Sequence, residues 1–194
     1  MHKLQNYILL MSFLTAGKLD LGDVLPEIDQ NFLNIDNKML ALDDVKGTAG
    51  TLVIFSCNTC PWVIKWEDRY VSLADIYTSK GIGFFVVNSN ASRFDGVDSI
   101  EKMKKHAEKM NYNFPYVQDS GARLANLFGA SKTPQIYLFD KRDRLVYTGA
   151  IDDNARDVRD VEEHYLINAI DELLSNKKIT KPISKAIGCS IKFP

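Results

Sequence analysis

A buried strand followed directly by a Cys-x-x-Cys helix start constrains the fold of this chain more than any other feature. Residues 51–55 read Thr-Leu-Val-Ile-Phe, a continuous apolar run typical of a strand buried on both faces. Apolar side chains then recur at helical spacing over residues 61–80. Cys57 and Cys60 lie in the turn between these two segments. The pattern predicts a layered α/β fold with both cysteines at the carboxyl end of a central strand.

The rest of the chain continues this alternation of strands and helices. The predicted strands are a hairpin and four further segments: 32–40, 84–88, 114–117, 135–139 and 144–148. The predicted helices after residue 80 are three: 99–110, 122–128 and 161–174. This order favours one central sheet covered by helices on both faces.

Length, charge and cysteine content exclude several classes of protein. The chain has 194 residues, enough for one domain with a substantial core. Its 24 basic and 25 acidic side chains give a net charge of −1, so we expect no nucleic-acid partner. No apolar run reaches the roughly 18 residues of a membrane-spanning helix, so we expect no membrane span in the mature chain. Three cysteines are too few for a disulfide scaffold.

The N-terminus matches a secretory signal peptide. Lys3 precedes an apolar stretch at residues 7–14, and Thr15-Ala-Gly17 supplies small residues suited to cleavage. We therefore expect a signal peptide over 1–17 and export to the periplasm or another extracytoplasmic space. The alternative is an apolar helix packed on a cytoplasmic domain. The remaining chain divides into a domain over 18–175 and a lysine-rich tail over 176–194.

The spacing of Cys57 and Cys60 suits redox chemistry. Two cysteines three residues apart at a helix start can close a disulfide, and the unpaired N–H groups there favour a thiolate. A zinc site needs about four ligands, and the chain has no second cysteine pair and no paired histidines. We expect neither a metal nor an organic cofactor.

Several segments together resemble the thioredoxin-like superfamily, specifically its exported redoxins with peroxiredoxin-like features. The matching segments are 53–62, 114–116, 129–135, 149–153 and 188–193. The resemblance implies a thioredoxin-like α/β fold, with a central mixed β-sheet flanked by helices and peroxiredoxin-like elaborations. It also assigns Cys57 as the exposed attacking cysteine and Cys60 as the resolving one. Thr133-Pro134 matches the cis-proline dipeptide that lies against the cysteines.

The same resemblance implies how a substrate is held. Thr133 would pair its backbone with a bound substrate chain, and Trp62 would flank the substrate groove. Two departures from thioredoxins stand out. Thr51 occupies the position of their buried aspartate, and Asn58-Thr59 replaces Gly-Pro between the cysteines.

The function predicted is thiol–disulfide exchange through Cys57 and Cys60. Its partners would be proteins carrying disulfides or dithiols, together with a separate redox partner that recycles the enzyme. One alternative is a peroxiredoxin-like thiol peroxidase with Cys60 as the reactive residue. Against it, Cys57 stands where that family has threonine, and Pro134 aligns with its arginine. The other alternative is a copper-binding chaperone, for which the cysteine spacing is one residue short and a third ligand is not evident.

Cys189 lies far from the other cysteines in the sequence. It sits in Gly188-Cys-Ser-Ile-Lys-Phe193, where apolar side chains could anchor a tail folded back on the domain. We expect a free or buried thiol. The alternative is a third redox thiol that reaches Cys57 or Cys60, which sequence distance cannot decide.

Overall fold

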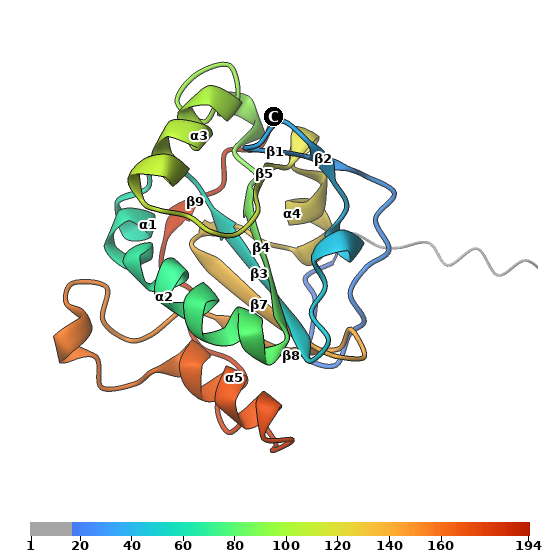
Figure 1. The fold of residues 1–194 in the computed structure, drawn as a ribbon, viewed down its shortest axis with the longest axis vertical. Helices are drawn as coiled ribbons and strands as arrows, with labels where there is room; N and C mark the ends of the chain where they lie inside the picture. Colours follow the sequence, from blue (N-terminus) through green and yellow to red (C-terminus); the bar gives the residue numbers. More distant parts are fainter. Residues whose placement is uncertain (1–16) are drawn as a thin grey trace, which may run out of the picture.

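A seven-stranded mixed sheet forms the centre of the computed structural model, which describes residues 17–194 (Figure 1). The strand order is β2-β1-β5-β4-β3-β7-β8. Their bounds are β1 Phe32–Asn34, β2 Met39–Leu40, β3 Gly50–Ser56, β4 Ile82–Asn88, β5 Tyr116–Gln118, β7 Gln135–Asp140 and β8 Leu145–Gly149. All but the last residue of the expected signal peptide, 1–17, lie outside the described residues.

Strand β3 is central and pairs differently on its two sides. It runs parallel to β4, with Ile54 opposite Val86, and antiparallel to β7, with Ile54 opposite Ile136. All seven residues of β3 are buried, which confirms the strand predicted from its apolar run. A separate two-stranded pairing joins β6 (Lys132–Thr133) to β9 (Cys189–Ser190).

Helices cover both faces of the sheet, as the alternation predicted. The α-helices are α1 Pro61–Trp66, α2 Asp68–Tyr77, α3 Ile100–Lys109, α4 Arg123–Phe128 and α5 Tyr165–Leu174. Side chains of α1, α2, α3 and α5 pack with Leu52 and Ile54 on one face of β3, whereas α4 packs with Val53 and Phe55 on the other. Short 3₁₀ turns are η1 Leu42–Val45, η2 Thr78–Lys80, η3 Ala91–Arg93, η4 Ser120–Ala122 and η5 Val158–Asp160.

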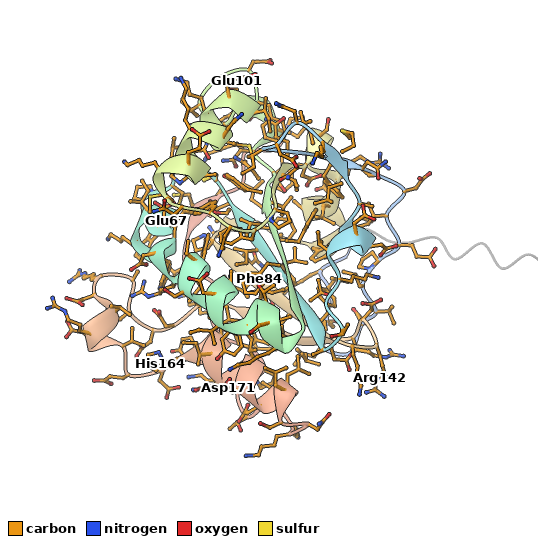
Figure 2. All side chains as sticks on the ribbon, in the orientation of Figure 1. Glu67, Phe84, Glu101, Arg142, His164 and Asp171 are labelled. Carbon is orange, nitrogen blue, oxygen red and sulfur yellow. The ribbon has the colours of Figure 1, made fainter. Side chains whose placement is uncertain are left out.

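Two predicted helices are shorter than expected. The helix over 61–80 is interrupted at Glu67, which Figure 2 shows at the junction of α1 and α2. The Glu67 carboxylate is buried and accepts hydrogen bonds from His106 Nε2 at 2.6 Å and Tyr112 Oη at 3.0 Å. The last helix begins at Tyr165, because the carbonyl of Glu163 bonds instead to the backbone of Asp153. In both places tertiary contacts override helical periodicity.

The C-terminal tail is part of the same folded unit. The backbone of Thr148 on β8 exchanges hydrogen bonds with Pro182 and Ser184, at 3.0 and 3.1 Å. Ile179 and Ile191 are buried against the domain. Within residues 17–194, no helix is long and apolar enough to cross a membrane.

Candidate active site

Cys60 sits where a helix begins. It caps α1, with Pro61 at the first helical position, where the missing N–H of proline costs nothing. The expected placement of the cysteine pair between a buried strand and a helix start is therefore confirmed.

The expectation that Cys57 is exposed is wrong. Cys57 and Cys60 each expose only 3% of their surface. Thr133 and Cys189 contact the cysteine sulfurs. Asn58, between the cysteines, donates its backbone N–H to Asp98 Oδ1 at 3.1 Å and its side-chain amide to the Val97 carbonyl at 2.9 Å. The burial of Cys57 could not be predicted from its position in the turn, because these contacts come from segments remote in the chain.

The Thr133–Pro134 peptide bond is cis and lies beside both cysteines. The Thr133 hydroxyl is 3.5 Å from Cys57 Sγ, and Cys60 Sγ lies 3.0 Å from the Thr133 carbonyl oxygen. The predicted contact between this dipeptide and the cysteines is thus confirmed. The backbone of Thr133, expected to pair with a substrate, pairs here with Cys189 of β9.

Cys189 completes a cluster of three cysteines. Its sulfur lies 2.6 Å from Cys60 Sγ, and its side chain is only half-buried. Trp62 borders the same cluster and is half-buried. Cys189, expected as a free or buried thiol, is a free thiol that lies next to the site.

The surroundings of the two paired cysteines shift their pKa values in opposite directions. Contacts with the Cys57 and Cys189 thiols lower the pKa of Cys60 despite its burial. The contact with Cys60, together with burial, raises the pKa of Cys57. These directions favour the thiolate on Cys60, whereas the family resemblance gives the attacking role to Cys57.

A buried polar network behind the cysteines was missed at the sequence level. Asp98 is fully buried and, besides the N–H of Asn58, accepts hydrogen bonds from the side-chain amides of Asn88 at 2.9 Å and Asn90 at 3.0 Å. Tyr116 donates to Asn58 Oδ1 at 3.0 Å. The available signal was a run of amide residues directly after the strand at 84–88. The network holds the turn between the cysteines from behind.

No group of three or more His, Cys, Asp or Glu side chains within residues 17–194 is placed to hold a metal ion.

The sheet, the cysteine pair and the cis-proline together define a thioredoxin-like protein. The chain belongs to the Redoxin family, whose model matches residues 20–165. No curated protein matches it significantly.

Solved structures share the fold over most of the chain. An uncharacterised conserved protein from Geobacillus kaustophilus is 35% identical, with a TM-score of 0.82 over 90% of this chain and 93% of that one. The thioredoxin domain of a thiol-disulfide oxidoreductase from Bacteroides vulgatus is 20% identical, with a TM-score of 0.59 over 81% and 99%. A peroxidoxin from Mycobacterium tuberculosis is 16% identical, with a TM-score of 0.53 over 80% and 94%. The last two similarities concern the fold alone.

Proposed function

We propose that the protein is a thiol–disulfide oxidoreductase whose redox couple is the pair Cys57 and Cys60. The observation that carries this proposal is the placement of both sulfurs at a helix start against Thr133–Pro134. Membership of the Redoxin family supports an oxidoreductase. The substrates would be proteins carrying disulfides or dithiols, with a second redox protein completing the cycle.

The chemistry is a two-step exchange. The Cys60 thiolate attacks one sulfur of a disulfide presented beside Thr133, which forms a mixed disulfide and releases one thiolate. Cys57 loses its proton and attacks Cys60 Sγ, which closes the Cys57–Cys60 bond and releases the second thiolate. Two electrons pass to the substrate, and the reverse sequence oxidises a dithiol. We infer this order of attack from the lowered pKa of Cys60 and from its position at the start of α1.

Turnover of insulin disulfides with dithiothreitol as reductant tests this proposal. We expect Cys60→Ser to abolish turnover, and we expect the double variant Cys57→Ser with Cys189→Ser, which lacks both neighbouring thiols, to accumulate a mixed disulfide on Cys60. Circular dichroism of each variant controls for folding. Turnover by Cys60→Ser at the wild-type rate would contradict the proposal, and a mixed disulfide trapped on Cys57 would reverse the order of attack.

One observation favours a second function, a thiol peroxidase acting through Cys60. The lowered pKa of Cys60 supplies the thiolate that attacks a peroxide oxygen. Against it, the sequence has Pro134 where peroxiredoxins align an arginine. We therefore expect slow peroxide reduction. Stopped-flow mixing of reduced protein with hydrogen peroxide decides, since a fast and saturable oxidation of Cys60 would favour the peroxidase.

We also propose that the protein acts outside the cytoplasm. The support is the sequence pattern of residues 1–17. Cell fractionation with N-terminal sequencing tests it: the expected product is a periplasmic chain beginning at Lys18. An intact N-terminus in the cytoplasmic fraction would contradict export.

A further inference from the structure

We propose that Cys189 is a third redox cysteine, which takes over the disulfide of the couple and carries it to the protein surface. This inference rests on the proposed exchange at Cys57 and Cys60 and adds a residue and a route to it. It also gives strand β9 a role: the chain's own tail occupies the place of a substrate strand.

The first support is the distance between sulfurs. Cys60 Sγ lies 2.6 Å from Cys189 Sγ, close to the roughly 2.05 Å of a disulfide bond, and a hydrogen bond also joins it to Cys57. Cys60 thus contacts both other sulfurs. A thiolate at Cys189 is close enough to Cys60 to exchange disulfides with it.

The second support is how the tail is held. Thr133 and Cys189 are paired residues of β6 and β9, on the backbone edge expected to receive a substrate. Gly188 permits this approach, because an added Cβ would collide with the Thr133 carbonyl and come within 3.2 Å of the Pro134 nitrogen. The site is shaped to seat a cysteine-bearing strand, and the tail supplies one.

Residues that follow Cys189 hold the C-terminal end of β9 through hydrogen bonds. Ile191 is buried and donates its N–H to the Ser131 carbonyl at 3.0 Å. The N–H of Lys192 donates to Asn90 Oδ1 at 2.9 Å, and the carbonyl of Lys192 accepts the N–H of Ser92 at 3.2 Å. The tail therefore has a defined seat beside the cysteines.

The third support is that Cys189 is more exposed to solvent than Cys57 and Cys60. Cys57 and Cys60 are 3% exposed, whereas Cys189 is half-buried. A disulfide between Cys57 and Cys60 is shielded from a protein substrate by the seated tail. A disulfide between Cys60 and Cys189 has one sulfur within reach of an external thiolate.

The transfer balances without an external oxidant. The Cys189 thiolate attacks Cys60 Sγ, the Cys60–Cys189 bond forms, and the Cys57–Cys60 bond breaks. Cys57 leaves as a thiolate and takes up one proton, which replaces the one lost by Cys189. A substrate thiolate then attacks Cys189 Sγ and releases the Cys60 thiolate. The second substrate thiol attacks the substrate sulfur of this mixed disulfide, which closes the substrate disulfide and releases Cys189 as a thiolate. The reverse order reduces a substrate.

Electrostatics support the direction of attack. Burial and its contact with Cys60 raise the pKa of Cys189 in the reduced protein. When Cys60 is held in a disulfide it no longer carries a negative charge, so this second cause disappears. Oxidation of Cys57 and Cys60 to a disulfide therefore favours the Cys189 thiolate, which is the form that attacks Cys60.

Disulfide mapping of the full chain tests the proposal. The protein is oxidised with one equivalent of diamide, quenched in acid, and labelled with N-ethylmaleimide in acidic denaturant. Trypsin places Cys57 and Cys60 in the peptide 47–65 and Cys189 in the peptide 186–192. We expect these peptides to be cross-linked in a fraction of the wild-type chains, with the label on Cys57 in that fraction.

Matched variants identify the sulfur that pairs with Cys189. We expect Cys57→Ser to form the cross-link and Cys60→Ser to lose it. The proposal would be overturned if N-ethylmaleimide labelled only Cys189 in the wild type. It would also be overturned if Cys60→Ser formed as much cross-linked peptide as the wild type.

Insulin turnover separates this inference from the proposed function. We expect Cys189→Ser to form the Cys57–Cys60 disulfide with diamide but to lose most of its turnover. Full turnover in Cys189→Ser would overturn the third-cysteine proposal and leave the Cys57–Cys60 couple standing. Wild-type protein without the Cys57–Cys60 disulfide and without turnover would instead contradict the proposed function itself.

Discussion

Cys57 and Cys60 are the same residue type three positions apart, yet their surroundings give them opposite properties. Cys60 caps α1, and its contacts with the Cys57 and Cys189 thiols lower its pKa. The contact with Cys60, together with burial, raises the pKa of Cys57. The spacing predicts the pair, but only the fold decides which sulfur is charged.

A thiolate on Cys60 predicts an early step in a spectroscopic titration. Free thiols ionise near pH 8.5. Because the pKa of Cys60 is lowered, one thiolate should already be present below that pH and disappear as the pH falls through the lowered pKa. Absorbance at 240 nm measures it. Cys57→Ala and Cys189→Ala each remove a donor to Cys60, so both should move the step to higher pH. If the absorbance step were unchanged in Cys60→Ser, the thiolate would belong to another cysteine.

Strand β9 is the element that the sequence left undefined, because its two residues have no period of their own. Its docking depends on Gly188, so we predict that Gly188→Ala displaces the tail and exposes Cys60. Such overpacking costs about 1–3 kcal/mol, which corresponds to roughly 5–150-fold in the population of the open form. The rate of native-state alkylation at Cys60 measures this population.

Gly96→Ala is the matched control for that substitution. Its added Cβ would meet only the Arg93 carbonyl, at an ordinary 3.7 Å. We expect the control to alkylate at the wild-type rate. Equal rates in both glycine variants and the wild type would show that β9 does not cover Cys60.

The α1–α2 junction depends on a contact with α3. Glu67 is buried, and His106 donates to its carboxylate at 2.6 Å. We predict that His106→Ala lowers the free energy of unfolding by about 1–3 kcal/mol, because a buried carboxylate loses a hydrogen-bond donor. Urea denaturation measures the change. His164→Ala, at the exposed start of α5 (Figure 2), should change stability little, and an equal loss in both variants would refute the role of the contact.

The overall architecture follows from periodicity, whereas the detail of the site does not. Continuous apolar runs predict β3 and β4 because both are buried on each face, and α3 follows from the apolar face marked by Met103 and Ala107. The cover over the cysteines depends on segments around residues 98 and 189, which are brought together only by folding. Such contacts leave no periodic signal in the sequence.

The buried tyrosines predict that the whole molecule loses stability in alkaline solution. Burial raises the pKa of Tyr70 and Tyr116 in the folded state, while the unfolded chain ionises near pH 10. Stability present below about pH 10 is therefore lost as the pH rises toward the folded-state pKa. Urea midpoints from about pH 8 to about pH 11 measure the loss. Tyr70→Phe should reduce the slope by up to about 1.4 kcal/mol per pH unit, and stability that is constant over this range would contradict the prediction.

The central claim is that this fold exists to present a two-electron cysteine couple, and a redox titration tests it most directly. Reduced protein is equilibrated in dithiothreitol buffers of graded potential, quenched in acid, and its thiols are counted by mass after alkylation. We predict one cooperative step in which the three thiols fall to one, and in which the ratio of oxidised to reduced protein changes tenfold for every change of about 30 mV in buffer potential, as a two-electron couple requires. Cys60→Ser should abolish the step. Three thiols retained at every potential, or a step that survives in Cys60→Ser, would contradict the account.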